Sequence, residues 1–253
     1  MLVKNFIKSN NNREIAFVRS FYDGKLKKLP GVVFLSGFRS DMEGTKALAL
    51  EKFFISEKRD FLRFDYSGHG ASSGNFSDLC LSDWLEDSIA VIEQLTEGPQ
   101  ILVGSSMGGW ISLLLAEKIP QKIKGIVGIA TAPDFTEDGF WKNFSIKQRK
   151  QLNEIGYVDL PTAYDNEPYR ITKKLIEDGR KHLIFGKKKL YDFPVRLLQG
   201  TNDADVKIEV PLKLLEEISC PDLRLTLVKG ADHSFSSKNC LEIITDSIAA
   251  VSK

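Results

Sequence analysis

The chain has 253 residues, of which 42% are hydrophobic and 27% are charged, as in an ordinary globular domain with a large core. Lysine and arginine together number 35, against 34 aspartates and glutamates. This balance excludes the strongly basic surface of a nucleic-acid-binding protein, so we expect no nucleic-acid partner.

The number of cysteines and the N-terminal sequence indicate the cellular compartment. Cys80, Cys220 and Cys240 are odd in number and widely spaced, which indicates neither a disulfide framework nor a zinc knuckle and favours a reducing compartment. No signal peptide, transit peptide or apolar run of about 18 residues is visible. We therefore expect a cytoplasmic protein without stable membrane insertion.

Eight apolar runs predict strands, and most of them alternate with helical patterns. The first two form a hairpin around the turn Asn10-Asn11-Asn12, and Gly31–Ser36 is typical of a strand buried on both faces. The alternation predicts an α/β fold: a mostly parallel eight-stranded sheet with helices on both faces. The predicted strands are Leu2–Lys8, Glu14–Ser20, Gly31–Ser36, Asp60–Asp65, Gln100–Gly104, Lys124–Ala130, Pro194–Gln199 and Leu223–Lys229. The predicted helices are Lys46–Glu57, Leu81–Leu95, Met107–Lys118, Glu209–Ile218 and Asn239–Val251.

One long segment interrupts this alternation. Phe135–Asp192 lies between two predicted core strands and contains short helical patches and many aromatic residues, but no clear strand. Segments of this length between core elements are usually lids. We expect a single domain over residues 1–253, with residues 135–192 inserted as a small helical cap.

The strongest motif is Gly104-Ser105-Ser106-Met107-Gly108, which fits G-x-S-x-G between a predicted strand and a predicted helix. In that setting the flanking glycines allow a tight turn that exposes the serine at the carboxyl end of the sheet. The alternative is a serine that caps the helix, and we assign that role to Ser105. The motif predicts Ser106 as the nucleophile of a hydrolase.

A serine hydroxyl needs a base, and the chain has three histidines. His233 follows a predicted strand and precedes the last helix, where active-site loops form in parallel sheets. His69 lies between glycines and is expected to hydrogen-bond locally in a turn. His182 lies in the inserted segment without a strand before it. The base is therefore predicted to be His233.

The loop Gly200–Val206 supplies the acid that orients this histidine. It holds Asp203 and Asp205, and the order serine, acid, histidine favours either one. We prefer Asp203 and expect Asp205 to be a surface or capping residue. For the oxyanion hole, the backbone N–H groups of Met107 and Phe38 are predicted donors.

Three stretches carry a family resemblance: Phe34–Ala47, Phe64–Gly74 and Pro99–Trp110. The chain resembles the α/β-hydrolases throughout. More narrowly, it is similar to the mitochondrial palmitoyl-protein thioesterase family, also described as acyl-glucuronide esterases, and its bacterial relatives. The resemblance is dense over residues 31–110 and loose over 135–192.

The resemblance implies that Ser106, Asp203 and His233 form the catalytic triad. Its G-x-x-D-x-x-V pattern falls on Gly200, Asp203 and Val206, which supports Asp203 over Asp205. The chain departs from many members of the superfamily at Ser36, where they have histidine before the oxyanion loop.

The leading hypothesis is a serine hydrolase that cleaves a carboxylic ester or thioester through an acyl-enzyme, with no metal or cofactor. A fatty-acyl thioesterase, acting on a small molecule or an S-acylated protein, is one form of it. The alternatives are a small-molecule carboxylesterase, an acyl-glucuronide esterase, or a non-catalytic binding module on the same fold. Six aromatic residues either line an acyl pocket or form the cap's own core, namely Phe38, Phe135, Phe140, Trp141, Phe144 and Tyr157.

Overall fold

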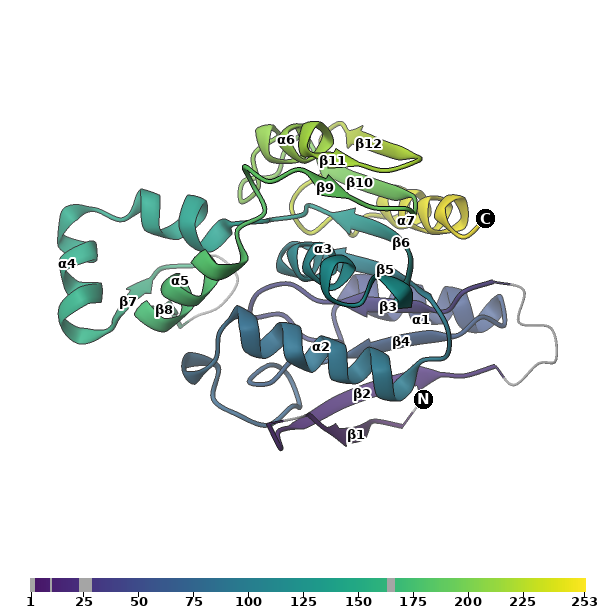
Figure 1. Cartoon of the computed structure of the whole chain (residues 1–253), viewed down its shortest axis with the longest axis horizontal. Coiled ribbons are helices and arrows are strands. Elements are labelled where there is room, and N and C mark those ends of the chain that lie inside the picture. The colour runs from purple at the N-terminus through teal and green to yellow at the C-terminus, as the bar shows by residue number, and fades with distance from the viewer. Residues whose placement is uncertain (1–2, 10, 23–28, 163–166) are drawn as a thin grey trace.

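The computed structural model describes residues 3–9, 11–22, 29–162 and 167–253, and an eight-stranded sheet forms its centre (Figure 1). The strand order is β1-β2-β4-β3-β5-β6-β10-β12. The strands from β4 to β12 run parallel, and the β1–β2 hairpin joins β4 antiparallel at one edge. The strands are β1 Asn5–Lys8, β2 Glu14–Ser20, β3 Val32–Leu35, β4 Phe61–Phe64, β5 Gln100–Ser105, β6 Ile123–Ile129, β10 Val195–Gly200 and β12 Leu223–Val228.

The expected mostly parallel sheet is thereby confirmed. Of the predicted first hairpin, Leu2 and Asn10 lie outside the described residues. The part of the turn that is described includes Asn12 with φ of 60°, a left-handed conformation that asparagine tolerates.

Helices cover both faces of the sheet, which is why the central strands are apolar on both sides. The helices α1 (Thr45–Ser56) and α7 (Lys238–Val251) pack together on one face. On the other face, α2 (Leu81–Leu95) packs beside α3 (Met107–Lys118), and the buried Trp84 and Trp110 come from this pair. The helix α6 (Glu209–Glu217) packs against β12.

Residues 135–192 leave the sheet after β6 and return before β10, extending to the left in Figure 1. They form α4 (Ile146–Ile155) and α5 (Lys173–Gly179), in agreement with the short helical patches predicted. Shorter helical turns here and in the core are η1 Phe76–Asp78, η2 Pro120–Lys122, η3 Thr136–Phe140, η4 Trp141–Asn143 and η5 Arg180–His182.

The expectation that this segment contains no strand is wrong. The strands β7 (Tyr157–Leu160) and β8 (Tyr169–Thr172) form an antiparallel hairpin, in which Val158 pairs with Ile171 and both are buried. A further short strand, β9 (Lys189–Leu190), pairs with β11 (Ile218–Ser219). Each strand has at most four residues, too few for the alternation of apolar and polar residues to stand out in the sequence.

Hydrogen bonds tie the inserted segment to the core at two places. At its neck, the Asp134 carboxylate accepts the N–H groups of Ile184 and Phe185 at 2.7 and 3.0 Å, which holds the two ends of the segment together. Farther out, the Asp178 carboxylate at the end of α5 accepts the N–H and the hydroxyl of Ser82 in α2, both at 2.8 Å. The Ser82 hydroxyl also lies 2.7 Å from Nε2 of His182, so this histidine lies at the α2 contact.

Candidate active site

The turn from β5 into α3 holds Ser106 in a strained conformation. Its φ of 55° and ψ of −115° are sparsely populated for a non-glycine residue and cost about 1–3 kcal/mol. A Cβ atom at Gly104 would overlap the carbonyl of Gly108, and one at Gly108 would overlap the carbonyl of Leu35. The Ser106 N–H donates to the Ile129 carbonyl at 2.8 Å, which anchors the turn on β6. Glycine is therefore needed on both sides of this serine.

Of the two adjacent serines, only Ser106 is half-exposed. Ser105 is the buried last residue of β5, so it does not cap α3 as expected. The residue at the capping position is Ser106, and its side chain makes no capping hydrogen bond. The Ser106 hydroxyl is therefore not used to hold the helix.

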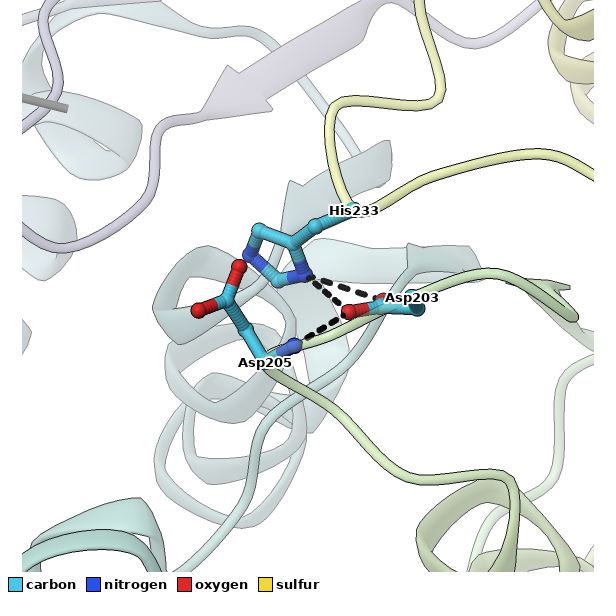
Figure 2. Close-up of side chains that lie close together, drawn as sticks. All are labelled: Asp203, Asp205 and His233. Atoms are coloured by element: carbon cyan, nitrogen blue, oxygen red, sulfur yellow. Dashed lines mark hydrogen bonds and ion pairs between the residues drawn. The ribbon is translucent and has the colours of Figure 1, made fainter. Parts of the chain in front are cut away.

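The loops after β10 and β12 bring Asp203 and His233 together (Figure 2). Nδ1 of His233 lies 2.9 Å from Oδ2 and 3.1 Å from Oδ1 of the Asp203 carboxylate. The Asp203 side chain is 1% exposed and that of His233 is 20% exposed. When Nδ1 carries the proton that Asp203 accepts, Nε2 has a free lone pair on the opposite edge of the ring.

Asp203 is buried yet stays ionised. Burial alone raises the pKa of its carboxyl, but hydrogen bonds from His233 and from the backbone N–H groups of Val206 and Asp205 bring that pKa below its ordinary value. The side-chain amide of Gln199 donates a further hydrogen bond to Oδ2 at 2.9 Å. A carboxylate held ionised in this way can stabilise a positively charged imidazole beside it.

The two aspartates of this loop differ in what their side chains do. Asp205 supports Asp203 through its backbone N–H, and its own carboxylate is exposed. Ligand atoms of Asp203, Asp205 and His233 lie within 4.8 Å of one another, as in a site for a cation. The Asp203 oxygens, however, already accept N–H groups from four residues, as expected of a carboxylate that pairs with a histidine.

Ser106 and His233 lie at the same edge of the sheet, because the carboxyl ends of parallel strands meet there. They are not hydrogen-bonded to each other within the described structure. Hydrogen bonds of this kind are often long until a substrate is bound. The catalytic roles of these side chains stay predictions.

The loop after β3 lies directly against Ser106. A Cβ atom placed on Gly37 would be 3.4 Å from the Ser106 Cβ. Phe38 follows Gly37, and Met107 is the first residue of α3. In the described part of the chain, no protein acceptor takes a hydrogen bond from the N–H of Phe38 or of Met107. Neither group therefore has, among the described residues, a protein acceptor that a ligand would have to displace.

The six aromatic residues considered as the lining of an acyl pocket fall into two sets. Phe38, Phe135 and Phe140 contact one another, with ring centroids 5.4–5.9 Å apart, and Phe38 belongs to the loop beside Ser106. The others pack within the inserted segment: Trp141 against the guanidinium groups of Arg149 and Arg180, Tyr157 against that of Arg170, and Phe144 in the buried core.

Two supporting residues were not recognised from the sequence as parts of the site. Gln199 is a buried amide that follows two leucines in β10, and this polar residue after an apolar pair was the available signal. His69 makes the expected local contact with the Ser67 carbonyl at 3.2 Å, but its Nε2 also accepts the N–H of Arg39 at 3.2 Å. No pattern in the sequence indicates the second bond, because 30 residues separate its two partners.

The parallel sheet and the strained serine at the head of a helix define the class of the protein, which is a serine hydrolase with the α/β-hydrolase fold. Residues 29–155 match the Hydrolase_4 family model, described as serine aminopeptidase, S33. The chain belongs to this family.

Among relatives, the chain is similar to the bovine mitochondrial palmitoyl-protein thioesterase ABHD10, with 36% identity over 222 residues that cover 87% of this chain and 72% of that protein. A putative hydrolase from Agrobacterium vitis S4 has a TM-score of 0.94 and 37% identity, covering 100% of both chains. Mouse α/β-hydrolase domain-containing protein 10 has a TM-score of 0.88 and 33% identity, covering 98% of this chain and 97% of that one.

Among the helices of the described residues, none has the length and apolar character needed to cross a membrane. The cytoplasmic location expected from the sequence stays a prediction, and the name of the bovine relative includes the word mitochondrial.

Proposed function

We propose that the protein hydrolyses carboxylic esters or thioesters through an acyl-enzyme formed on Ser106. The observation that carries this proposal is the pairing of His233 with a buried, ionised Asp203 at the sheet edge where Ser106 is half-exposed. An imidazole oriented in this way is the base that a serine hydroxyl requires.

In the first half of the reaction, Ser106 Oγ attacks the acyl carbonyl carbon while Nε2 of His233 takes the hydroxyl proton. The N–H groups of Phe38 and Met107 stabilise the oxyanion. The carbon–oxygen or carbon–sulfur bond then breaks, and the leaving alcohol or thiol receives the proton from His233. In the second half, water attacks the acyl-enzyme by the same route and releases the carboxylic acid and Ser106.

We further propose a fatty-acyl thioester as the substrate, carried by a small molecule or by an S-acylated protein. The names of the ABHD10 relatives support this choice, and so do the aromatic rings of Phe135 and Phe140, which contact Phe38 in the loop that lies against Ser106. Residues 135–192 then act as a cap on a single domain, because Phe135 and Phe140 bring the inserted segment against the loop of Phe38.

A second candidate is hydrolysis of small esters with short acyl groups, including acyl glucuronides. Phe135 packs edge to face against both Phe38 and Phe140, and the rings of Phe38 and Phe140 are tilted against each other by 59°. This packing restricts the space that a long chain can occupy without moving the rings. A short acyl group needs less of this space.

The decisive experiment compares oxyesters and thioesters with matched acyl chains from two to sixteen carbons, by kcat/KM. For the long-chain thioesterase, kcat/KM rises up to about fourfold per methylene, since a buried methylene contributes about 0.8 kcal/mol. A maximum at two to four carbons selects the small-ester candidate. A fluorophosphonate that fails to modify Ser106 would contradict both.

A further inference from the structure

The loop that carries Phe38 is a β-turn with a strained residue in it. The Ser40 N–H donates to the Gly37 carbonyl at 3.1 Å, which closes a turn with Phe38 and Arg39 at its centre. Arg39 has a φ of 54°, whereas Phe38 is not among the described residues with positive φ. This sign pattern is that of a type II turn, whose third position normally takes glycine or asparagine. Arginine at that position is disfavoured by its Cβ atom.

Type I and type II turns differ by a flip of the central peptide, and here the N–H of that peptide is the Arg39 N–H. Nε2 of His69 accepts this N–H at 3.2 Å. His69 can accept it only when neutral, with the proton on Nδ1, where the Ser67 carbonyl lies 3.2 Å away. The hydrogen bond from Arg39 thus favours the flipped peptide in spite of the strained residue.

The surroundings of His69 hold it in this form. Its side chain is 4% exposed, and its ring packs edge to face with those of Tyr66, Phe76 and Trp84 at 5.0–5.5 Å. Burial, with a smaller effect of the Arg39 charge, lowers the pKa of His69 to about 4. The imidazole is therefore a neutral, fixed acceptor over the pH range in which His233 can act as a base.

We propose that His69 is a positioning residue for the oxyanion hole. The Gly37 carbonyl accepts the Ser40 N–H, so the Phe38 N–H on the same peptide points away from Ser40. The bond from Arg39 to His69 fixes the next peptide and so holds the Gly37–Ser40 turn, together with the Phe38 N–H, in place. Gly37 lies against Ser106, so this N–H is presented beside the nucleophile. The inference rests on the proposed function, in which Phe38 is an oxyanion donor.

The test compares two amide substitutions of similar polarity and different reach. In His69→Gln the amide reaches the position of Nε2 and can accept the Arg39 N–H. In His69→Asn it reaches only the position of Nδ1 and keeps the Ser67 contact alone. We expect kcat to stay within about threefold for His69→Gln. For His69→Asn we expect a fall of about 10- to 100-fold with KM within twofold, because loss of one oxyanion donor costs about 10²–10³ in kcat.

Two further measurements separate positioning from packing. The affinity for a trifluoromethyl ketone, which forms a tetrahedral adduct on serine, should fall in His69→Asn in proportion to kcat. Arg39→Gly removes the strain of the type II form. It should therefore raise the Tm more in the wild type, where the His69 bond holds that form, than in His69→Asn, where the turn can return to the unstrained type I form.

Equal kcat values in His69→Gln and His69→Asn would overturn the proposal, as would a loss in His69→Asn that appears only in KM. Equal effects of Arg39→Gly on the Tm of the two backgrounds would also overturn it. Failure of the proposed function gives a different result: the wild type would lack esterase and thioesterase activity, or Ser106→Ala would retain that activity. The effect of Arg39→Gly on the Tm of the wild type and of His69→Asn could still be measured in that case.

Discussion

At the scale of single residues, the backbone of Ser106 is the feature that separates it from Ser105. A positive φ at the head of α3 exposes Ser106, whereas Ser105 is buried at the end of β5. The same turn leaves the Met107 N–H without a protein acceptor among the described residues, so one local conformation supplies both the proposed nucleophile and a proposed oxyanion donor.

The first prediction concerns this serine. Ser106→Ala should lower kcat by about 10⁴–10⁶-fold, because it removes the atom that forms the acyl-enzyme. The Tm should change little, since the hydroxyl makes no capping hydrogen bond. Ser105→Ala is the matched control and should retain most of the activity. Initial rates with an activated ester measure both, and an inactive Ser105→Ala beside an active Ser106→Ala would contradict the assignment.

The second prediction concerns the acid. Asp203→Asn should lower kcat about 10⁴-fold, because an amide does not hold the required tautomer of His233 or stabilise its charged form. Asp205→Asn should change kcat less than about fivefold, since the Asp205 backbone N–H, which it keeps, is what supports Asp203. If both variants lose the same amount of activity, Asp203 is not the sole orienting acid.

At the scale of elements, the inserted segment is held to the core by α2 and α5. Burial raises the pKa of the Asp178 carboxyl, but the Ser82 N–H, the Cys80 thiol, the Ser82 hydroxyl and Lys181 together bring it below its ordinary value. The carboxylate is therefore ionised at neutral pH, and it joins two elements that are 96 residues apart in the chain.

The third prediction is that this contact limits the motion of the segment. Asp178→Asn should lower the free energy of unfolding by about 1–3 kcal/mol, because buried donors lose a charged acceptor. It should also speed proteolytic cleavage within residues 135–192. Lys181→Ala is the control, since that lysine is 70% exposed and solvent screens its ion pair. Equal cleavage rates in the wild type and Asp178→Asn would show that the contact does not restrain the segment.

The fourth prediction separates the aromatic residues that contact Phe38 from those that pack only within the inserted segment. Phe140→Ala enlarges the space around Phe38, so the acyl-chain length with the highest kcat/KM should increase by two or more carbons. Phe144→Ala removes a core residue and should lower stability by about 3–5 kcal/mol without moving that optimum. The chain-length series and denaturant unfolding measure the two effects. If the optimal acyl-chain length changes in Phe144→Ala but not in Phe140→Ala, then Phe144, and not Phe140, limits the space for the acyl chain.

At the scale of the whole molecule, the buried imidazole of His69 links stability to pH. Its pKa is about 4 in the native state and near 6.5 in the unfolded chain, so between these values the unfolded chain binds a proton that the native protein does not. The native state therefore loses stability as the pH falls from 6.5 towards 4.

The fifth prediction follows from this linkage. The stability of the wild type relative to His69→Gln should decrease by about 2 kcal/mol from pH 7 to pH 4.5. The comparison isolates His69, because buried carboxyls such as Asp65 and Asp134 titrate in both proteins. Urea unfolding at several pH values measures the difference. A difference that stays constant with pH would mean that His69 does not carry this linkage.

Much of the fold could be predicted because its signals are local. The strained turn at Ser106 needs Gly104 and Gly108 within four residues, and a continuous apolar run is enough to indicate a strand covered on both faces. The positions of Asp203 and His233 after two parallel strands follow from the same pattern, since such strands end at one edge of the sheet. The α/β-hydrolase class and its candidate residues were therefore determined by the sequence alone.

The tertiary structure decided the features that depend on residues far apart in the chain. The β7–β8 hairpin was missed because each strand has only four residues and its pairing, not its pattern, stabilises it. The division of the aromatic residues into two sets, and the contact of Asp178 with Ser82, arise from packing between separate elements. The bond from Arg39 to His69 joins two turns after different strands, and such a contact exists only once the sheet has brought those turns together.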